Sequence, residues 1–515
     1  MSAGAVITGL ALVATACGAR TAPYLGGDAA GTPGGAANGI APGTGAGGQA
    51  GAPAGGSKGA LSGGGSAGPA GGTLGGATGG GAGPGGGQGG SSPSSAGGTA
   101  GGQASSPAAS GLTQSNFPFD PRAEAALCTG TAGNTASDQG VTPTSITFGN
   151  VSGLTGVLSN NFNQGPEAVQ SLFDAIDAAG GICGRQLKLN VEDDGQDSTK
   201  NSADVADLAP RVFAFVGSTS DADNGGVQEM QNAKTPDIGF GINPNRGQSP
   251  EYWSAGGTSQ YFQNGHPYIY NSLPLGLKAA GNYPSKLAVL AYSIPISADA
   301  GQEFQRLFAA SGSSICFTDY SISPATTSLD QDVLQMKNKG CTGVYTTMDV
   351  TGNAKLLDAM QRQNFSPVWK ATTFDGYTPA QISVAGQSAA QGFEVGLPFV
   401  PLSDNNPVIN EYLSELHTYE PGKDPSGFGV EAWASAEMLV YALVKAGHNP
   451  TRAGVVSIFN ALTNWNTGGA TAPYTPRTHY PAGPCTTEAV AKGSDFTRKW
   501  PSSGFFCQGQ LTQVG

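Results

Sequence analysis

Short apolar segments alternate with amphipathic helical segments from Val141 onward, and no other feature of the sequence constrains the fold as strongly. Strands are expected at 145–151, 185–194, 211–217, 236–241, 286–292, 314–320, 341–347 and 367–373. Helices are expected between them at 166–181, 198–209, 223–233, 298–311, 330–339 and 352–364. Strands that alternate with helices in this way form parallel sheets with helices on both faces. The pattern predicts an α/β fold with doubly wound parallel sheets. Two helical runs, 405–419 and 431–447, then break the alternation, as expected where a chain crosses back to an earlier lobe.

The residues before this body have a different composition. Between 26 and 110 the chain holds 35 glycines in 85 residues and no aromatic residue. Such a stretch buries too little apolar surface to offset its ordering entropy, so residues 18–115 are predicted to form a disordered tether. A flexible chain of roughly a hundred residues reaches on the order of 55 Å. The remaining residues, 116–515, hold 40 of the 41 aromatic residues and are numerous enough for two lobes.

The first residues have the pattern of an export signal. A short apolar run, AVITGLALVA, is followed by small residues and Cys17. An apolar core that ends in small residues is typical of a secretory signal. With Cys directly after them, residues 1–17 resemble a bacterial lipoprotein signal peptide. The resemblance implies that Cys17 is acylated and becomes the N-terminus, so that a lipid anchor holds the protein at the cell membrane on its extracytoplasmic side.

The cysteine count also favours an exported protein. Six cysteines remain after Cys17, and an even number in a secreted chain indicates disulfides, although the sequence alone leaves 15 pairings open. Local order along the chain favours three pairs, Cys316–Cys341, Cys485–Cys507 and Cys128–Cys183.

Composition and motifs exclude several classes of function. The body has 22 Lys and Arg against 35 Asp and Glu and no basic run, which argues against nucleic acid because phosphate neutralisation needs clustered cations. No apolar stretch reaches 18 residues, so no transmembrane helix is expected. The body has no G-x-S-x-G, H-E-x-x-H or P-loop motif, and no C-x-x-C pair or close histidine pair. We therefore expect no catalysis, no metal and no cofactor.

One turn is a candidate binding site on its own chemistry. Gly217 to Asp221, with the sequence GSTSD, lies between a predicted buried strand and the helix that follows. Hydroxyl groups and free amides at the start of a helix suit a carboxylate or another small anion. The alternative is an ordinary N-cap, because Ser, Thr and Asp are the preferred capping residues.

Three phrases carry a resemblance to a known family: GVTPTSITFGNVSGLTG, DAIDAAGGICGRQLKLNVEDDGQDS and VFAFVGSTS. Together they resemble type I periplasmic binding proteins, and in particular the Leu/Ile/Val-binding branch that serves ABC importers. The most specific part runs from Asp177 to Arg185 and is followed by a strand that ends in Glu-Asp-Asp. The resemblance covers about 140–465. It implies two lobes joined by crossing segments, with a ligand cleft between them. The first lobe would hold about 140–270 and 400–450, and the second about 271–399 and 451–515.

The resemblance also implies which residues bind the ligand. The family's carboxylate-holding turn falls on Ser218, Thr219 and Ser220, and its next loop ends at Ile242 and Asn243, which replace Ala and Thr. On the second lobe, Ile296 and Ser297 stand where the family has Tyr-Gly. Asp375 would pair with an amino group and stands beside Tyr377, and the loop from Thr346 to Asp349, with Thr347 as its expected contact, would complete the second-lobe side. The replacements leave open whether the ligand is a branched-chain amino acid. Phe428 and Trp433, where the chain re-enters the first lobe, are candidates for the cleft wall or for core packing.

The sequence therefore predicts a lipoprotein that captures a small polar solute, an amino acid or an amide, and delivers it to an ABC transporter permease. The alternative is a ligand-sensing receptor of the same fold that is coupled to a membrane regulator, because one fold serves both uses.

Overall fold

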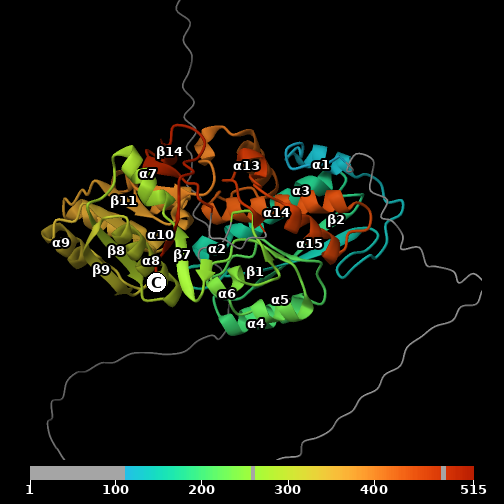
Figure 1. Cartoon of the computed structure of the whole chain (residues 1–515), viewed down its shortest axis with the longest axis horizontal. Helices are drawn as coiled ribbons and strands as arrows, with labels where there is room; N and C mark the ends of the chain where they lie inside the picture. The colour runs from blue at the N-terminus through green and yellow to red at the C-terminus, as the bar shows by residue number, and fades with distance from the viewer. Residues whose placement is uncertain (1–110, 257–260, 477–482) are drawn as a thin grey trace, which may run out of the picture. The chain divides into compact units, whose positions relative to one another are not determined.

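Two sheets covered by helices form the described part of the chain, which in the computed structural model comprises residues 111–256, 261–476 and 483–515 (Figure 1). These residues belong to one compact unit. Residues 1–17 and most of the predicted tether lie outside the described residues. The predicted α/β fold with two lobes is confirmed. Within the described residues, no helix has the length and apolar character needed to cross a bilayer.

The first lobe is built on a five-stranded parallel sheet with the order β2-β1-β3-β4-β5. Its strands are β1 (Ser145–Ser152), β2 (Gln186–Asp193), β3 (Phe215–Val216), β4 (Asp237–Ile238) and β5 (Tyr252–Trp253). Strand β1, which lies between β2 and β3, is buried along nearly its whole length, as a strand between two helical layers must be.

Helices cover both faces of this sheet. Those beside it are α2 (Ser159–Phe162), α3 (Gln164–Ala178), α4 (Ser198–Leu208), α5 (Val227–Ala233) and α6 (Pro244–Gly247). The side chain of Phe148 on β1 belongs to the core that contains α3, whereas Val151, three residues later, belongs to the core under α4 and α5. Side chains at alternate positions of the strand therefore pack against opposite helical layers.

The second lobe is built on a seven-stranded sheet with the order β14-β13-β12-β11-β10-β8-β9. Its strands are β8 (Lys286–Tyr292), β9 (Ser314–Ile322), β10 (Gly343–Thr346), β11 (Trp369–Thr372), β12 (Glu394–Leu397), β13 (Thr487–Lys492) and β14 (Asp495–Trp500). Its helices are α7 (Ser272–Ala280), α8 (Pro295–Ala310), α9 (Asp330–Asn338), α10 (Val350–Arg362), α11 (Pro379–Ala385) and α12 (Gln387–Ala390). The first five strands in chain order pair in parallel, whereas β13 and β14 are antiparallel.

The chain passes between the two sheets three times. It crosses between β5 and β8, returns between β12 and α13 (Pro407–Tyr419), and crosses again between α15 (Arg452–Ala461) and β13. On the first crossing, β6 (Tyr261–Gln263) and β7 (His266–Tyr270) form a small sheet with β15 (Leu511–Gln513) at the end of the chain. Before its last crossing the chain lies against the first sheet, because Arg452 on α15 donates hydrogen bonds to the carbonyls of Val212 and Phe213.

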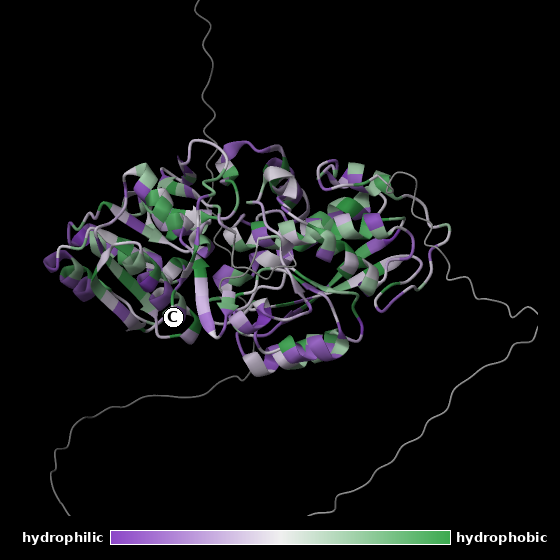
Figure 2. Cartoon of the chain, viewed as in Figure 1, coloured by the Kyte–Doolittle hydropathy of each residue, from purple (hydrophilic) through white to green (hydrophobic). Residues whose placement is uncertain are grey.

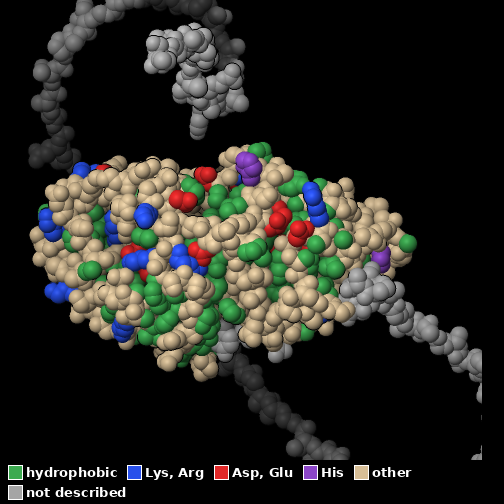
Figure 3. All heavy atoms as spheres, turned by 90° about the horizontal axis from the view of Figure 1, so that it is seen from above, with side chains coloured by type: hydrophobic (Ala, Val, Ile, Leu, Met, Phe, Trp, Pro, Cys, Tyr) green, Lys and Arg blue, Asp and Glu red, His purple; other side chains and the backbone are tan. Residues whose placement is uncertain are grey.

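Helix α14 (Gly427–Ala446) is almost completely buried. It packs against α3, α15 and the short α1 (Pro121–Leu127). Hydropathy is highest along such inner helices and lower on outer ones such as α9 (Figure 2). On the face seen from above, charged side chains are scattered among hydrophobic and uncharged ones, in keeping with a chain of which only 12% is charged (Figure 3).

Three disulfides join the cysteines in the pairs that local order favoured. Cys128–Cys183 links the end of α1 to the turn before β2, Cys316–Cys341 links β9 to the turn before β10, and Cys485–Cys507 links the start of β13 to the C-terminal segment. The predicted pairing is confirmed.

The predicted elements of 145–373 are present, but several have different bounds. Strands expected at 211–217 and 236–241 are reduced to two residues each in β3 and β4. Helix α14 begins at Gly427 and not at 431, because the Ser426 hydroxyl caps it by accepting a hydrogen bond from the Gly429 amide. The β13–β14 hairpin was not predicted, although Gly493 between two alternating segments is a turn signal.

Two buried carboxyl groups join α1 to α14. Glu124 and Glu437 are fully buried, and their oxygens find no donor among the described residues other than each other. Burial raises the pKa of Glu124 to about 8, and burial together with the neighbouring Glu124 raises the pKa of Glu437. At least one of the two is therefore protonated at neutral pH, so that they can share a hydrogen bond.

This pair is expected to contribute stability that is lost as the pH rises. The pKa values are higher in the folded chain than in the unfolded chain, so the folded state binds more protons between about pH 5 and pH 8. We expect the free energy of unfolding to fall across this window by about 1.4 kcal/mol per pH unit for each proton involved. Glu437→Gln should flatten this dependence, measured by urea unfolding at a series of pH values. The exposed Asp424→Asn is the matched control and should leave the slope unchanged.

Candidate functional site

A cavity of about 260 Å³ lies between the two lobes and extends into the second. Its first-lobe wall is formed by Leu158, Asn161, Phe162, Asp221, Phe240, Ile242 and Phe428. Its second-lobe wall includes Tyr292, Ile296, Ser297, Ala300, Glu303, Phe304, Leu307, Tyr345, Thr347, Asp349, Thr372, Thr373, Phe374 and Asp375. Ile269, Tyr270, Ser272, Leu273, Gly396, Leu397, Pro398, Gly483, Cys485 and Thr486 complete it. The lining residues that follow β3, β10 and β11 lie at the carboxyl ends of parallel strands, where ligands bind in this class of fold.

The polar end of the cavity is formed by residues of both lobes. The side-chain amide of Asn161 on α2 donates a hydrogen bond to Asp375 Oδ2 at 3.1 Å, and Asp375 follows β11 in the second lobe. The Thr373 hydroxyl donates to the other oxygen of Asp375. The Asn161–Asp375 contact is therefore a direct polar link across the cavity.

Two oxygen atoms at this end have no partner among the described residues. They are Asn161 Oδ1 and Asp221 Oδ1, and both are buried. Burial raises the pKa of Asp221 to about 7, with contributions from Asp194 and Asp223. Burial also raises the pKa of Asp375 to about 6, to which the nearby Asp349 adds. Unsatisfied buried acceptors cost free energy, and a ligand that donates hydrogen bonds would remove that cost.

The second-lobe wall is held by contacts between two neighbouring loops. The Ser297 hydroxyl donates to the Thr347 carbonyl, and the Thr347 hydroxyl donates to the Ser297 carbonyl, both at 2.8 Å. The Tyr292 hydroxyl donates to Asp349, which also caps α10 by accepting from the Gly352 amide. These bonds fix the turn after β8 to the turn after β10.

The predicted turn of hydroxyl residues lies beside the cavity, but its three side chains do not line it. The Val151 amide donates to Ser218 Oγ, the Thr219 hydroxyl donates to the Phe162 carbonyl, and the Ala222 amide donates to Ser220 Oγ. The hydroxyls are thus engaged within the first lobe. The next residue, Asp221, does line the cavity.

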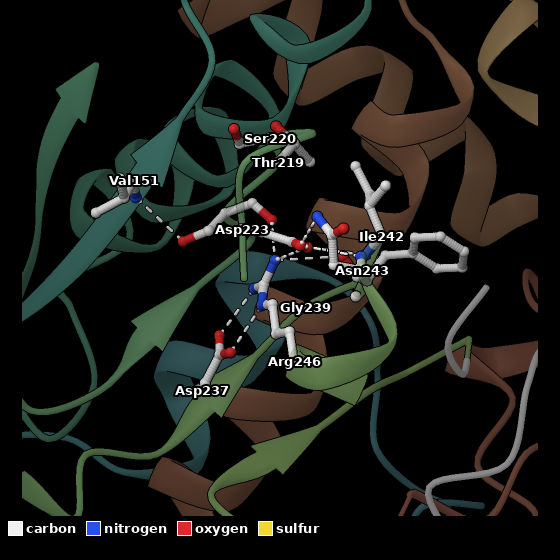
Figure 4. Close-up of polar contacts among 12 residues, drawn as sticks. Val151, Thr219, Ser220, Asp223, Asp237, Gly239, Ile242, Asn243 and Arg246 are labelled. Carbon is white, nitrogen blue, oxygen red and sulfur yellow. Dashed lines mark hydrogen bonds and ion pairs between the residues drawn. The ribbon is translucent and has the colours of Figure 1, made fainter. Parts of the chain in front are cut away.

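A buried arginine holds the neighbouring first-lobe loop. Arg246 donates two hydrogen bonds of 2.8 Å to Asp237 and also contacts Asp223 at 3.2 Å (Figure 4). Asp223 in turn accepts from the backbone amides of Ile242 and Asn243. Ile242 consequently lines the cavity, whereas the Asn243 side chain donates to Asp223 and to the Asp221 carbonyl.

Of the other predicted site residues, some line the cavity and others do not. Ser297, Thr347 and Asp375 line the cavity. Tyr377 does not, because its ring packs against Phe399 and Phe496 and its hydroxyl accepts from the Leu402 amide at 2.8 Å. Of the two aromatic candidates, Phe428 lines the cavity, whereas Trp433 is in the core and donates to Glu415.

Asn161 was not predicted as a site residue. Asp221 ends the predicted turn after β3 and Asp349 ends the predicted loop after β10, and both line the cavity although neither was assigned a contact of its own. Asn161 lies in a four-residue helix with no pattern of its own, and only its place after β1 could have indicated it.

The described residues contain one group of three possible metal ligands, Cys128, Cys183 and His448. The two cysteines are joined in a disulfide and His448 hydrogen-bonds to Asn134, so this group does not form a metal site.

Residues 145–493 match the family model described as periplasmic binding protein, which is more than half of the chain. The chain belongs to this family. Its members are solute-binding proteins and not enzymes, and they act outside the cytoplasm. No curated protein matches this sequence.

Solved structures share the fold of this periplasmic binding protein at low sequence identity. A fatty acid ABC transporter substrate-binding protein from Thermomonospora curvata is 18% identical, with 75% of this chain and 96% of that chain covered and a TM-score of 0.58. A branched-chain amino acid transporter substrate-binding protein from Streptococcus pneumoniae, in complex with isoleucine, is 14% identical, with 69% and 100% covered and a TM-score of 0.57. A leucine-binding protein from Thermotoga maritima is 14% identical, with 69% and 98% covered and a TM-score of 0.54. At this identity the likeness establishes the fold alone.

Loss of the buried arginine should destabilise the first lobe. Arg246→Met leaves Asp237 and Asp223 buried without their charge partner, and breaking a buried ion pair in this way costs about 3–5 kcal/mol. We expect a loss of that size in the free energy of unfolding, measured with urea. The control is Arg211→Met, which breaks an exposed pair with Asp207 and should cost less than about 1 kcal/mol. Equal effects of the two substitutions would contradict the assigned role of Arg246.

Proposed function

We propose that this chain is the extracytoplasmic solute-binding component of an ABC importer, which captures a solute in the cavity between its lobes and delivers it to a membrane permease. The cavity supports this function most strongly, because its walls come from both lobes and meet at the carboxyl ends of parallel strands. A site divided between two lobes is suited to capture by closure, since the ligand contacts both lobes only when they are together.

The contact between Asn161 and Asp375 supports this mechanism. It joins the first lobe to the second at the polar end of the cavity, where a solute would lie. Aromatic rings of the cavity wall also pack across the lobes, with Phe374 of the second lobe 4.9 Å from Phe240 and 5.0 Å from Phe428 between ring centroids. In the proposed mechanism, solute binding adds to these contacts and shifts the lobes toward the closed arrangement.

The composition of the wall supports a solute with a substantial apolar part. The sequence predicted a small polar solute held by Ser218, Thr219 and Ser220, but those hydroxyls are engaged within the first lobe, and the wall is dominated by aliphatic and aromatic side chains. Two of the similar structures are named for branched-chain amino acids or fatty acids, whose side chain or tail is apolar. We therefore extend the proposed solutes from amino acids and amides to larger apolar molecules.

The proposed placement in the cell follows from the N-terminal residues, which lie outside the described part of the chain. A lipid on Cys17 would anchor the protein to the membrane. The glycine-rich tether, which the sequence placed at 18–115 but which would end before the buried Leu112, would let the body reach a permease or bind solute away from the surface.

Solute binding can be detected by a thermal-shift screen of the full chain against amino acids, amides, fatty acids, aliphatic alcohols and amines. A ligand that binds only the folded state adds about 2.7 kcal/mol of stability at a hundred times its Kd. We expect one chemical class to raise the melting temperature. The double variant Asp221→Ala, Asp375→Ala should lose that shift, because both side chains line the cavity.

The matched control is Asp299→Ala, an exposed carboxylate on α8 that does not line the cavity. It should retain the full shift. If no class of solute stabilises the chain, the proposed function is wrong. If a solute stabilises the double variant as strongly as the parent, the assigned site is wrong.

A further inference from the structure

The two ends of the cavity differ in chemistry, and this difference bears on the class of solute under the function proposed above. At one end, the side chains of Asn161, Asp221 and Asp375 belong to the wall, with Asp349 close to Asp375. The amide nitrogen of Asn161 already donates to Asp375, which fixes the orientation of the side chain and leaves its oxygen without a partner. This end therefore offers hydrogen-bond acceptors and negative charge.

The opposite end lies inside the second lobe and is mostly apolar, although Glu303 of α8 and Ser272 of α7 also belong to the second-lobe wall. Phe304 and Leu307 reach it from α8, Leu273 from α7 and Leu397 from β12. Tyr345 of β10 is nearly inaccessible to solvent and forms part of the same wall. The cavity thus enters the core between the sheet and the helices that cover it. An apolar chain placed there would have its surface removed from water, which favours binding.

No described residue of the wall is a Lys, Arg or His. A solute carboxylate at the polar end would face the carboxyl groups of Asp221, Asp349 and Asp375 without a cation, and the negative charge of those that are ionised opposes its binding in a poorly solvated site. A group that donates hydrogen bonds has the opposite effect, because it satisfies Asn161 Oδ1 and Asp221 Oδ1, which are otherwise buried without partners.

We propose that the cavity selects an apolar molecule that has a hydrogen-bond donor and no negative charge at one end, with an aliphatic primary amine as the best complement. The donor lies among Asn161, Asp221 and Asp375, and the aliphatic chain extends between α8 and β12 into the second lobe. This inference rests on the proposed function, since it names the solute class for the same site.

Calorimetric titration of the full chain with probes of equal chain length tests the polar end. The probes are n-octylamine, n-octanol and octanoate, with leucine as a solute that carries both an amine and a carboxylate. We expect n-octylamine to bind about tenfold or more tightly than octanoate, with n-octanol between them, because hydrogen bonds to charged groups are the stronger ones. Tighter binding of octanoate or of leucine than of n-octylamine overturns the inference.

Substitutions test the contributions of the two ends of the site to binding separately. Asp221→Asn and Asp375→Asn keep the size of the side chains but remove charge. Each should therefore lower the affinity for n-octylamine by about tenfold and the affinity for n-octanol much less. Asp299→Asn on the exposed face of α8 is the control and should change neither affinity. Ala300→Leu adds volume to the wall, so it should lower the affinity for n-octylamine more than the affinity for the shorter n-hexylamine. Equal effects of Ala300→Leu on both amines, or no effect of the aspartate substitutions, overturn the inference.

Failure of this inference is distinguishable from failure of the proposed function. If the aliphatic probes do not bind but another class in the thermal-shift screen does, the inference is wrong and the solute-binding function stands. If no solute of any class binds, both are wrong.

Discussion

The buried ion pair between Arg246 and Asp237 is the interaction on which the first-lobe side of the site depends. Both strands that precede the relevant loops, β3 and β4, are only two residues long, so their ladders alone provide little to hold the loops that follow. Arg246 also contacts Asp223 and the Ser218 carbonyl, and Asp223 fixes the backbone at Ile242 and Asn243. One side chain therefore sets the relative position of the two loops that present Asp221 and Ile242 to the cavity. Removing a charge from water is costly, and the cost is offset here only because the guanidinium is bound by two carboxylates and by backbone carbonyls.

Much of the fold could be predicted from the sequence because it is expressed in local patterns. The apolar segment at 286–292 became β8 with the same bounds, and the run at 314–320 became the longer β9. The disulfides followed local order, since the cysteines of two pairs are 25 and 22 residues apart in the sequence. The family phrase from Asp177 to Arg185 also has a physical role, as the Asp177 carboxylate accepts from the Leu187 amide and the buried Arg185 donates to the Thr142 carbonyl.

The site was less predictable because it depends on which hydroxyls and carboxylates remain free after the lobes have packed. Ser218 and Thr219 have the residue types expected of an anion site, but their partners, Val151 and Phe162, lie more than fifty residues away in sequence. The depth of the cavity is set by the packing of α8 and α7 against the second sheet, to which no short motif corresponds. Asp375 was predicted and does line the cavity, because the loop after a parallel strand is a position that sequence can locate. Its interlobe partner Asn161 could be found only once both lobes were in place.

In the mechanism proposed here, one cavity shared by the lobes holds the apolar chain of the solute in the second lobe and its donor group at the interlobe end. Crystallography of the full chain with an octylamine that carries bromine at its far carbon tests this most directly, because anomalous scattering locates the bromine independently of the rest of the ligand. We expect the bromine near Leu273, Phe304 and Leu397, and the amine within hydrogen-bond distance of Asn161 Oδ1 and Asp221. A bromine outside the cavity, or a reversed ligand with its amine in the second lobe, would contradict it.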